Sequence, residues 1–548
     1  MVLEFLASVQ HFPQTAVLIS ALSLATYLII KRALGARTKL PLPPGPPTDS
    51  IWGNTFDAAF SYRRFEIWTQ EYGPVFSLRM GILGLGGIRT IVIGRHQAAI
   101  DIMEKHGADL SDRPTFIAAG ETLSGGMRIL LVGTQAGGGT KFKKLRKTIQ
   151  SHLQPKTTFL YHPVLRQMSR QHLLDIIDEY EHRASDGGSD GTSSSFVSTK
   201  HQQHAKRYAA AVVMSLAYGK VPQRYEDPDI QAVNRCLSRI GHAMRPGAWK
   251  VDVVPLLKYL PGHMSQLKVW HKEELELFGG KIDEVRAKMN RGEEVPASFG
   301  KYLIEHQASL GLSDNETAYL AGSMFGAGSD TSASAISIAL MAAICHPEAQ
   351  KRVQDELDSV VGRGRPPTFS DQDSLPQTMA FVNEASRWRP VSAGGFPHRA
   401  TKDIIWQGYV IPKGSTVVAN TWSVGRDPDV FPDPETFNPQ RWIVIDSTGR
   451  AILRDDLKSY PFGFGRRVCP GQHLATASIF MNLALILWAF NLTPDEKHPI
   501  DTYAFTESAN AQPLPFNAVF TPRVSVRPED GEGKGWEILK EAFEGYGM

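Results

Sequence analysis

The stretch FGFGRRVCPG contains one of only three cysteines in this chain. Arg466 and Arg467 closely precede Cys469, and an apolar, helix-forming stretch begins a few residues after it. Nearby cations and the N-terminal end of a helix both favour the anionic form of a thiol. The pattern therefore predicts a thiolate at Cys469, whereas Cys236 and Cys345 are interpreted as small buried hydrophobic side chains.

A thiolate in this setting could be a nucleophile or a metal ligand. A cysteine nucleophile needs a neighbouring base, but His473 would lie on the following helix and not beside the sulfur. A zinc site needs three further Cys or His ligands at regular spacing, and the surrounding sequence has none. A single protein thiolate favours haem iron, because the porphyrin supplies the other ligands.

The spacing within this stretch is specific. Phe462, Gly465, Arg467, Cys469 and Gly471 stand in the order Phe-x-x-Gly-x-Arg-x-Cys-x-Gly. This order resembles the haem-ligand signature of the cytochromes P-450. The resemblance implies haem b as cofactor, with Cys469 as the ligand of its iron and Phe462 packed beneath it. Gly465 and Gly471 allow the tight backbone path around the sulfur.

A second motif, AGSDT, lies inside the longest helix that the sequence predicts. It resembles the oxygen-activating motif of the same family, and the resemblance extends over about residues 5–525. It implies that O₂ is a substrate and that Thr331 and Asp330 deliver protons for cleavage of the O–O bond. Ala327 and Gly328 are expected to leave room for O₂ beside the helix.

Two further motifs are structural. Glu384 and Arg387 lie one helical turn apart, a spacing that suits an ion pair. They resemble the Glu-x-x-Arg motif of the family, and Pro439, Arg441 and Trp442 resemble its Pro-x-Arg-aromatic motif. The resemblance implies a buried network between the two motifs that supports folding and haem retention.

The propionates of a haem need cationic partners. Arg467 and Arg146 are the arginine candidates, and His398 resembles a third propionate contact of the family. The family has a tryptophan four residues before the arginine that corresponds to Arg146, and Phe142 takes that place here. One propionate hydrogen bond is therefore missing from the expected set.

A run of basic side chains precedes and follows Arg146. Lys141, Lys143, Lys144 and Lys147 are expected on the same side of the molecule as Arg466. Such a patch suits the docking of an acidic flavoprotein. The sequence has no flavin or nicotinamide motif, so the resemblance implies that an NADPH–cytochrome P-450 reductase supplies the electrons.

The N-terminal segment predicts a membrane anchor. Residues 5–30 are almost entirely apolar, and about 20 such residues suffice for a helix to cross a bilayer. Lys31, Arg32 and Arg37 follow the segment, and this order places the rest of the chain on the cytosolic side. A cleaved signal peptide would carry its basic residues before the apolar run. The predicted location is the endoplasmic reticulum membrane, with a single span and a cytosolic catalytic domain.

Three regions follow from these patterns. Residues 1–38 are predicted to be the membrane anchor, 39–47 a stiff proline-rich hinge, and 48–548 a haem-thiolate monooxygenase domain. The expected fold class is mainly α with small β-sheets, that is, a cytochrome P-450 fold preceded by one N-terminal transmembrane helix.

The sequence also predicts several individual elements of that fold. PVFSLRMG and IRTIVIG predict strands, and a capping box at Ser313 predicts the start of a long core helix that ends near Pro347. Residues 184–200 are rich in Ser, Gly and Asp and predict an exposed loop. The tail, residues 499–548, predicts strands followed by a charged, partly mobile end.

Composition limits the function. The formal net charge of +3 over 548 residues gives no overall signal for nucleic-acid binding. Mostly apolar or glycine-rich segments, residues 116–139, the stretch before Gly326 and residues 391–396, are expected to face a lipophilic substrate. The predicted activity is a monooxygenase acting on a secondary metabolite, such as a polyketide, terpenoid or alkaloid intermediate in a fungal pathway. The alternatives are oxidative phenol coupling and an O₂-independent haem-thiolate isomerase or dehydratase.

Overall fold

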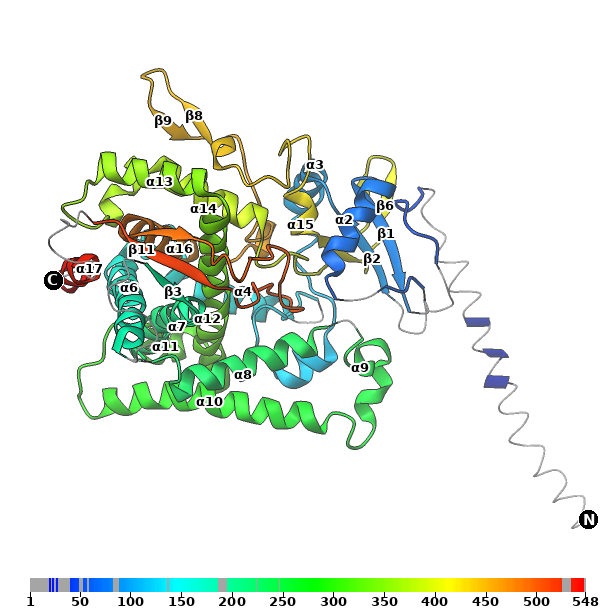
Figure 1. Cartoon of the computed structure of the whole chain (residues 1–548). Coiled ribbons are helices and arrows are strands. Elements are labelled where there is room, and N and C mark those ends of the chain that lie inside the picture. The colour runs from blue at the N-terminus through cyan, green and yellow to red at the C-terminus, as the bar shows by residue number, and fades with distance from the viewer. Residues whose placement is uncertain are drawn as a thin grey trace, which may run out of the picture.

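The fold is built around two long buried helices, α12 (Asp314–Cys345) and α16 (Gln472–Ala489), in the computed structural model (Figure 1). The structure describes residues 40–546 except 49–52, 57–58, 82–87, 136–137, 186–194, 223, 246 and 525–533, together with 19–20, 22–23 and 26–27.

Helices surround these two on most sides. The longer ones are α2 (Ser61–Tyr72), α4 (Gly138–Leu153), α6 (His162–Ser185), α7 (His201–Tyr218), α8 (Pro228–Ala243), α10 (Ser265–Asn290), α11 (Phe299–Leu310), α13 (Pro347–Val360), α14 (Pro376–Trp388) and α17 (Lys534–Glu544). Short α-helical turns are α3 (His96–Ala99), α5 (Pro155–Thr158), α9 (Lys250–Val253) and α15 (Thr421–Val424). The protein is mainly helical, as the sequence predicts.

The sheets are small. The largest has the strand order β1-β2-β7-β4 and comprises β1 (Val75–Met80), β2 (Ile88–Ile93), β7 (Thr416–Ala419) and β4 (His398–Arg399). Within it β2 and β7 run parallel and the other pairs antiparallel. A second sheet has the order β10 (Phe490–Thr493), β11 (Ala518–Pro522) and β3 (Phe196–Ser198). Two hairpins, β5 (Ile404–Trp406) with β6 (Tyr409–Ile411) and β8 (Ile443–Ile445) with β9 (Ala451–Leu453), complete the set. The two strands predicted from PVFSLRMG and IRTIVIG are thus confirmed.

The capping box at the start of α12 is present. The Glu316 backbone N–H donates to the Ser313 hydroxyl, and the Ser313 backbone N–H donates to the Glu316 carboxylate, both at 3.2 Å. From there α12 runs through the centre of the helical region (Figure 1), and most of its residues are buried. The helix ends at Cys345, two residues before Pro347. The predicted core helix and both of its ends are confirmed.

Two segments differ from the expectation. Residues 184–200 are not all loop, because β3 pairs there with β11 and buries Phe196. The charged C-terminal end forms α17, in which Trp536 stacks on Tyr180 with ring centroids 4.3 Å apart. Both corrections have the same cause: a few buried aromatic side chains outweigh the polar composition of the segment around them.

The predicted anchor, residues 5–30, lies almost wholly outside the described residues and stays a prediction. Among the described residues, α12 and α16 are long and apolar enough to cross a membrane, but both are mostly buried as core helices. The described part of the proline-rich segment lies along the sheets. The Pro44 carbonyl accepts from the Ser77 N–H at 2.7 Å, and the Pro41 carbonyl accepts from the Val410 N–H at 2.9 Å.

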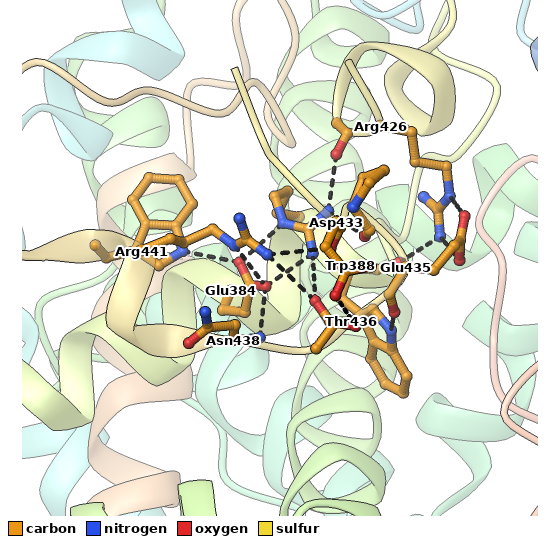
Figure 2. A network of polar contacts seen from close by, with 12 residues as sticks. Glu384, Trp388, Arg426, Asp433, Glu435, Thr436, Asn438 and Arg441 are labelled. Carbon is orange, nitrogen blue, oxygen red and sulfur yellow. Dashed lines mark hydrogen bonds and ion pairs between the residues drawn. The ribbon is translucent and has the colours of Figure 1, made fainter. Parts of the chain in front are cut away.

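Glu384 on α14 is the centre of a buried polar network (Figure 2). Its carboxylate accepts two hydrogen bonds from Arg387, at 2.7 and 2.8 Å, and both side chains are fully buried. It also accepts from Arg441 at 3.1 Å, from the Trp442 indole at 2.9 Å and from the Asn438 backbone at 2.9 Å. The predicted buried network between α14 and the Pro-x-Arg-aromatic turn is present.

The remaining guanidinium N–H groups of this network hold the chain that follows α15. Arg387 donates to the Gly425 and Pro434 carbonyls at 2.8 Å each. Burial acts to raise the pKa of Glu384, but the hydrogen bonds and charges of Arg387 and Arg441 outweigh it, so the pKa lies below its ordinary value. The carboxylate therefore stays ionised and ties α14 to residues 425–442.

We expect Glu384→Ala to lower the free energy of unfolding by about 3–5 kcal/mol, because Arg387 would be left buried without a partner. Denaturant unfolding of the haem-free chain measures the change. Asp355→Ala, which breaks the exposed Lys351–Asp355 pair on α13, is the control and should cost at most about 1 kcal/mol.

The pH dependence has a defined sign. Since the folded pKa of Glu384 is lowered, its contribution is complete above the ordinary carboxyl pKa of 4.5 and is lost as the pH falls through the folded value. Equal losses for the two variants, or a loss that does not shrink in acid, would contradict this role.

Candidate active site

A cavity of about 800 Å³ lies between α4, α7, α8, α12 and α16. Residues from all five helices line it, together with loops around 391–396, 461–471 and 506–512. Cys469 and Thr331, predicted from separate motifs, both face this cavity. The tertiary structure therefore brings the two predicted halves of the site together.

Cys469 is held in a tight loop just before α16. Its backbone N–H donates to the Phe462 carbonyl at 2.9 Å, which closes the loop. Gly465 has φ +55°, and a side chain there would lie 3.0 Å from the Met103 carbonyl oxygen. A Cβ on Gly471 would lie 3.9 Å from the Cys469 sulfur. Gly465 is thus required by its backbone conformation, whereas Gly471 keeps the space beside the sulfur open.

The charge state of Cys469 differs from the expectation. Burial raises the pKa of the Cys469 thiol, although a hydrogen bond from the Gly471 backbone N–H and the charge of Arg146 act to lower it. The cation that acts on the sulfur is Arg146 and not the predicted Arg466 or Arg467, and together with the backbone N–H at the start of α16 it does not outweigh burial. The thiolate therefore needs a stronger positive charge directly at the sulfur, as a metal cation would provide.

One wall of the cavity collects arginines. Arg467 donates to the Ser111 carbonyl at 2.7 Å and to the Val132 carbonyl at 2.6 Å, and its guanidinium lies 3.6 Å from the centre of the Phe142 ring. Arg146 donates to the Val468 carbonyl at 2.6 Å. Phe142, in the place of the expected tryptophan, thus stacks on Arg467.

Arg113 is a third member of this wall, and the motifs did not indicate it. It is buried and donates to the Leu130 and Pro397 carbonyls. Burial, with repulsion from Arg467, lowers the pKa of Arg113 to about 9. In the sequence, Arg113 could have been found from its position just before the predicted substrate-facing stretch, residues 116–139.

These three arginines form a cationic cluster whose charge the Asp112 carboxylate offsets only in part. Within the described parts of the chain, no carboxylate oxygen lies within 4 Å of Arg113, Arg146 or Arg467. Burial lowers the pKa of Arg467 to about 10, and it lowers the pKa of Arg146 as well. Like charges that are partly removed from water repel one another. The cluster therefore fits an anionic ligand, and the two carboxylates of the haem propionates carry the matching negative charge.

His398 lies beside the cluster, as expected, but its state differs from that of a propionate donor. The ring is buried, and its Nδ1 lies 2.6 Å from the Leu110 carbonyl oxygen. Burial and the charge of Arg113 lower the pKa of His398 to about 3. A neutral ring must donate its single N–H to that carbonyl. The predicted contact with a propionate requires His398 to take up a second proton.

Thr331 and Asp330 lie on the cavity side of α12 but have separate partners. The Thr331 hydroxyl donates to the Ala327 carbonyl at 2.7 Å. The Asp330 carboxylate accepts from the Gln512 side-chain amide. Burial raises the pKa of Asp330, against the opposing effects of Lys206 and Gln512. Gln512, from the C-terminal loop, is a site residue that no motif indicated.

Gly328 also has a packing role that the motif did not indicate. A Cβ built on it would lie 2.3 Å from Val213 of α7. The glycine therefore lets α7 and α12 pack closely, in addition to bordering the cavity.

The expected basic surface is partly paired. Lys144 forms a salt bridge with Glu316 at 2.8 Å, and Lys141 lies 4.0 Å from the same carboxylate. Lys143, Lys147 and Arg466 are exposed. The surface that a partner protein could use is thus smaller than the sequence suggests.

The predicted substrate-facing segments contribute in part. Arg128 to Leu130, Ser323 and Met324, and Val391 to Phe396 supply residues to the lining. The first segment also carries two charges: Arg128 lines the cavity and pairs with Glu274, whereas Glu121 pairs with Lys258 at 3.7 Å. The sequence did not indicate that the end of α8 and the loop 506–512 also form the wall.

The sequence profile of the cytochrome P450 family matches residues 43–518. This chain belongs to the cytochrome P450 family. It is 50% identical to cytochrome P450 monooxygenase 64 of Postia placenta, over 88% of this chain and 91% of that protein. It is 47% identical to cytochrome P450 monooxygenase 113 of the same organism, over 94% and 97%. It is also 33% identical to the monooxygenase criE of Aspergillus cristatus, over 95% and 92%.

Membership in the cytochrome P450 family implies a haem-thiolate iron cofactor. The residues of this cavity fit that group. Cys469 offers a sulfur at the floor, Phe462 lies in the same loop, and the cationic wall can receive the propionates. When bound, the haem supplies the iron chemistry of O₂ activation.

We expect Cys469→Ser to abolish the red-shifted Soret band that the thiolate-ligated CO complex of the family gives. The change removes the only sulfur that borders the cavity near residues 462–471. CO-difference spectra of the purified, haem-supplemented protein measure this. Cys345→Ser is the matched control and should keep the band. A normal band in Cys469→Ser would contradict ligation by this residue.

Arg146→Met should weaken haem binding by about tenfold or more, since a charge-assisted hydrogen bond contributes about 1.5–3 kcal/mol. Titration of the haem-free chain with haem measures the dissociation constant. Lys147→Met removes the same charge from the exposed face of α4 and should leave the constant within about twofold. Equal losses in both variants would argue against a propionate contact of Arg146.

Proposed function

We propose that this cytochrome P450 oxidises a lipophilic secondary metabolite of a fungal pathway with O₂ and two electrons. One oxygen atom enters a C–H bond of the substrate, and the other leaves as water with two protons. The observation that supports this proposal is the position of Thr331 and Asp330 on α12, at the same cavity as Cys469. An acid and an alcohol at this place suit proton delivery to O₂.

Different side chains of the cavity have different roles in this reaction. The Thr331 hydroxyl can hold a proton donor or a water at the centre of the cavity, and its backbone partner, the Ala327 carbonyl, orients it. Asp330 titrates closer to neutral pH than an exposed carboxyl because burial raises its pKa, which suits a group that gives and takes protons. Apolar side chains of α8, such as Leu237 and Ile240, hold the lipophilic part of the substrate.

The proposal also includes the source of the electrons and the location of the protein in the cell. The exposed cations Lys143, Lys147 and Arg466 support docking of an acidic NADPH–cytochrome P-450 reductase. The apolar segment 5–30 supports a single-span anchor in the endoplasmic reticulum membrane, with the catalytic domain in the cytosol.

The test uses haem-loaded full-length protein with a reductase, NADPH and oxygen-18 gas. Naphthalene is the lipophilic probe, and labelled naphthol is the expected product. 2-Naphthol is a second probe, because phenol coupling would give an unlabelled dimer from it. Turnover that consumes no O₂ would overturn the proposal in favour of an isomerase or dehydratase, and an unlabelled dimer as the sole product would favour coupling.

Thr331→Val should reduce the product formed per NADPH at least about tenfold, since a positioned proton donor contributes about 10²–10⁴ in rate. NADPH consumption should continue, with hydrogen peroxide as the product of O₂ reduction. Ser329→Ala is the control, because this buried hydroxyl of α12 donates to the Phe325 carbonyl and does not line the cavity. Unchanged coupling in Thr331→Val would contradict the proton-delivery role.

A further inference from the structure

The C-terminal loop, residues 506–512, brings an amide into contact with the acid of α12. Gln512 lines the cavity, and its side-chain N–H group donates to the Asp330 carboxylate. The two residues are 182 positions apart in the chain, so only the fold creates this contact. Within the described parts of the chain, no other side chain donates a hydrogen bond to that carboxylate.

The backbone around Gln512 is fixed on two sides. Its N–H group donates to the Thr506 hydroxyl at 3.1 Å, and its carbonyl accepts from the Thr506 backbone N–H at 2.9 Å. The carbonyl of the next residue, Pro513, accepts from the Gln202 side chain of α7 at 3.2 Å. The fold therefore sets the place from which the Gln512 amide reaches α12.

The nearest hydroxyl groups of α12 do not order the Asp330 carboxylate. The Thr331 hydroxyl donates to the Ala327 carbonyl at 2.7 Å. The Ser334 hydroxyl donates to the backbone carbonyl of Asp330 at 2.8 Å. Both groups lie within about one helical turn of Asp330, but each bonds to the backbone. The orientation of the carboxylate therefore depends on the loop that carries Gln512.

The charge state of Asp330 depends on opposing effects. Burial raises the pKa of the carboxyl, whereas the charge of Lys206 on α7 and the hydrogen bond from Gln512 lower it. Tyr225, in the turn before α8, interacts with the same carboxylate. Burial raises the pKa of Tyr225, and the charge of Asp330 adds to this effect, so the phenol stays neutral. Gln512 and Lys206 thus both favour the ionised form of Asp330.

A purely structural reason for the contact would be attachment of the loop to the helices. Gln202 already serves that purpose at Pro513, and an apolar side chain in place of Gln512 could pack against α12 equally well. An amide has a further property. Its N–H group donates to an ionised carboxylate, and after rotation by half a turn its C=O group accepts from a protonated carboxyl. Gln512 can therefore keep its hydrogen bond while Asp330 gains and loses a proton.

We propose that Gln512 is a positioning residue for proton delivery, which holds the Asp330 carboxyl at the cavity wall in both of its protonation states. Asp330 remains the group that gives and takes the proton, and Gln512 acts only through it. The C-terminal loop thus contributes to the reaction as well as to the cavity wall. The inference rests on the proposed role of Asp330, and a measurement without turnover separates the two.

Infrared difference spectra provide that measurement. Spectra of the haem-loaded full chain, taken against Asp330→Asn, isolate the carbonyl stretch of the protonated Asp330 carboxyl. The intensity of this band is followed against pH without NADPH or reductase. Gln512→Met removes the donor with little change in side-chain length, so the band should persist to higher pH than in the wild type. Gln512→Glu adds a like charge and should move the band further in the same direction.

Turnover with the reductase, NADPH and naphthalene tests the consequence for the reaction. Gln512→Met should lower the product formed per NADPH at least about threefold at neutral pH, since a positioned proton donor contributes about 10²–10⁴ in rate. The pH profile of this ratio should move to higher pH together with the infrared band. In the Asp330→Asn background, Gln512→Met should cause no further loss, because its effect passes through Asp330.

Gln202→Met is the matched control. Gln202 bonds to the same loop, at the Pro513 carbonyl and the Phe516 backbone N–H, but it does not line the cavity. This variant should leave the infrared titration and the pH profile as in the wild type. The haem content of each variant reports whether the chain is folded.

Three results would overturn the inference. They are an infrared band that titrates at the same pH in the wild type and in Gln512→Met, an equal shift in Gln202→Met, and a further loss when Gln512→Met is added to Asp330→Asn. Unchanged product per NADPH in Asp330→Asn alone would instead refute the proposed function of Asp330. The infrared titration would still decide whether Gln512 holds that carboxyl.

Discussion

Three arginines on one wall of the cavity, the buried Arg113 and the half-buried Arg146 and Arg467, donate to backbone carbonyls and have no carboxylate within 4 Å among the described residues. Burial lowers the pKa of all three, and the more distant Asp112 carboxylate offsets this only in part for Arg113 and Arg467. An anionic ligand at this wall would relieve the repulsion among the three guanidinium groups, and haem propionates would supply such charges.

Positive charge also acts on the cysteine. Burial alone keeps Cys469 protonated, and the helix N-terminus and Arg146 reduce this effect without reversing it. The site is therefore suited to a thiolate that a bound metal cation would stabilise. The Cys469–Phe462 backbone hydrogen bond and the glycine conformations separately shape the loop that holds the sulfur.

The opposite side of the cavity depends on α12. This helix approaches α7 closely at Gly328, begins with a capping box and is buried on nearly all faces. These contacts leave little freedom for Thr331 and Asp330. Arg387, which is paired with Glu384, holds the region that follows α15 through hydrogen bonds to the Gly425 and Pro434 carbonyls. Figure 2 shows Glu384 at the centre of this network. Rigid elements thus position the residues that we propose to move protons, and the variable part of the wall comes from the end of α8 and the C-terminal loop.

Much of this arrangement was readable from local sequence. The capping box at Ser313 and the strand patterns at 74–94 are short-range signals, and both were confirmed as elements of the fold. The spacing around Cys469 is equally short-range, and its role as a haem ligand stays a prediction. β3 and α17 were missed because one or two buried aromatic residues decide their structure, and burial depends on distant partners such as Tyr180. Arg113 and Gln512 belong to no local pattern, since the fold brings them to the cavity from remote segments.

The sequence by itself determined the chemistry that this protein can hold, a single cysteine in a glycine-shaped loop and an acid–alcohol pair on a long core helix. Residue type and spacing suffice for that, because both motifs are short. Only the tertiary structure decided the charge states. The pKa of Cys469, Asp330 and His398 depends on burial and on cations from other segments, and these distances exist only once the chain has folded.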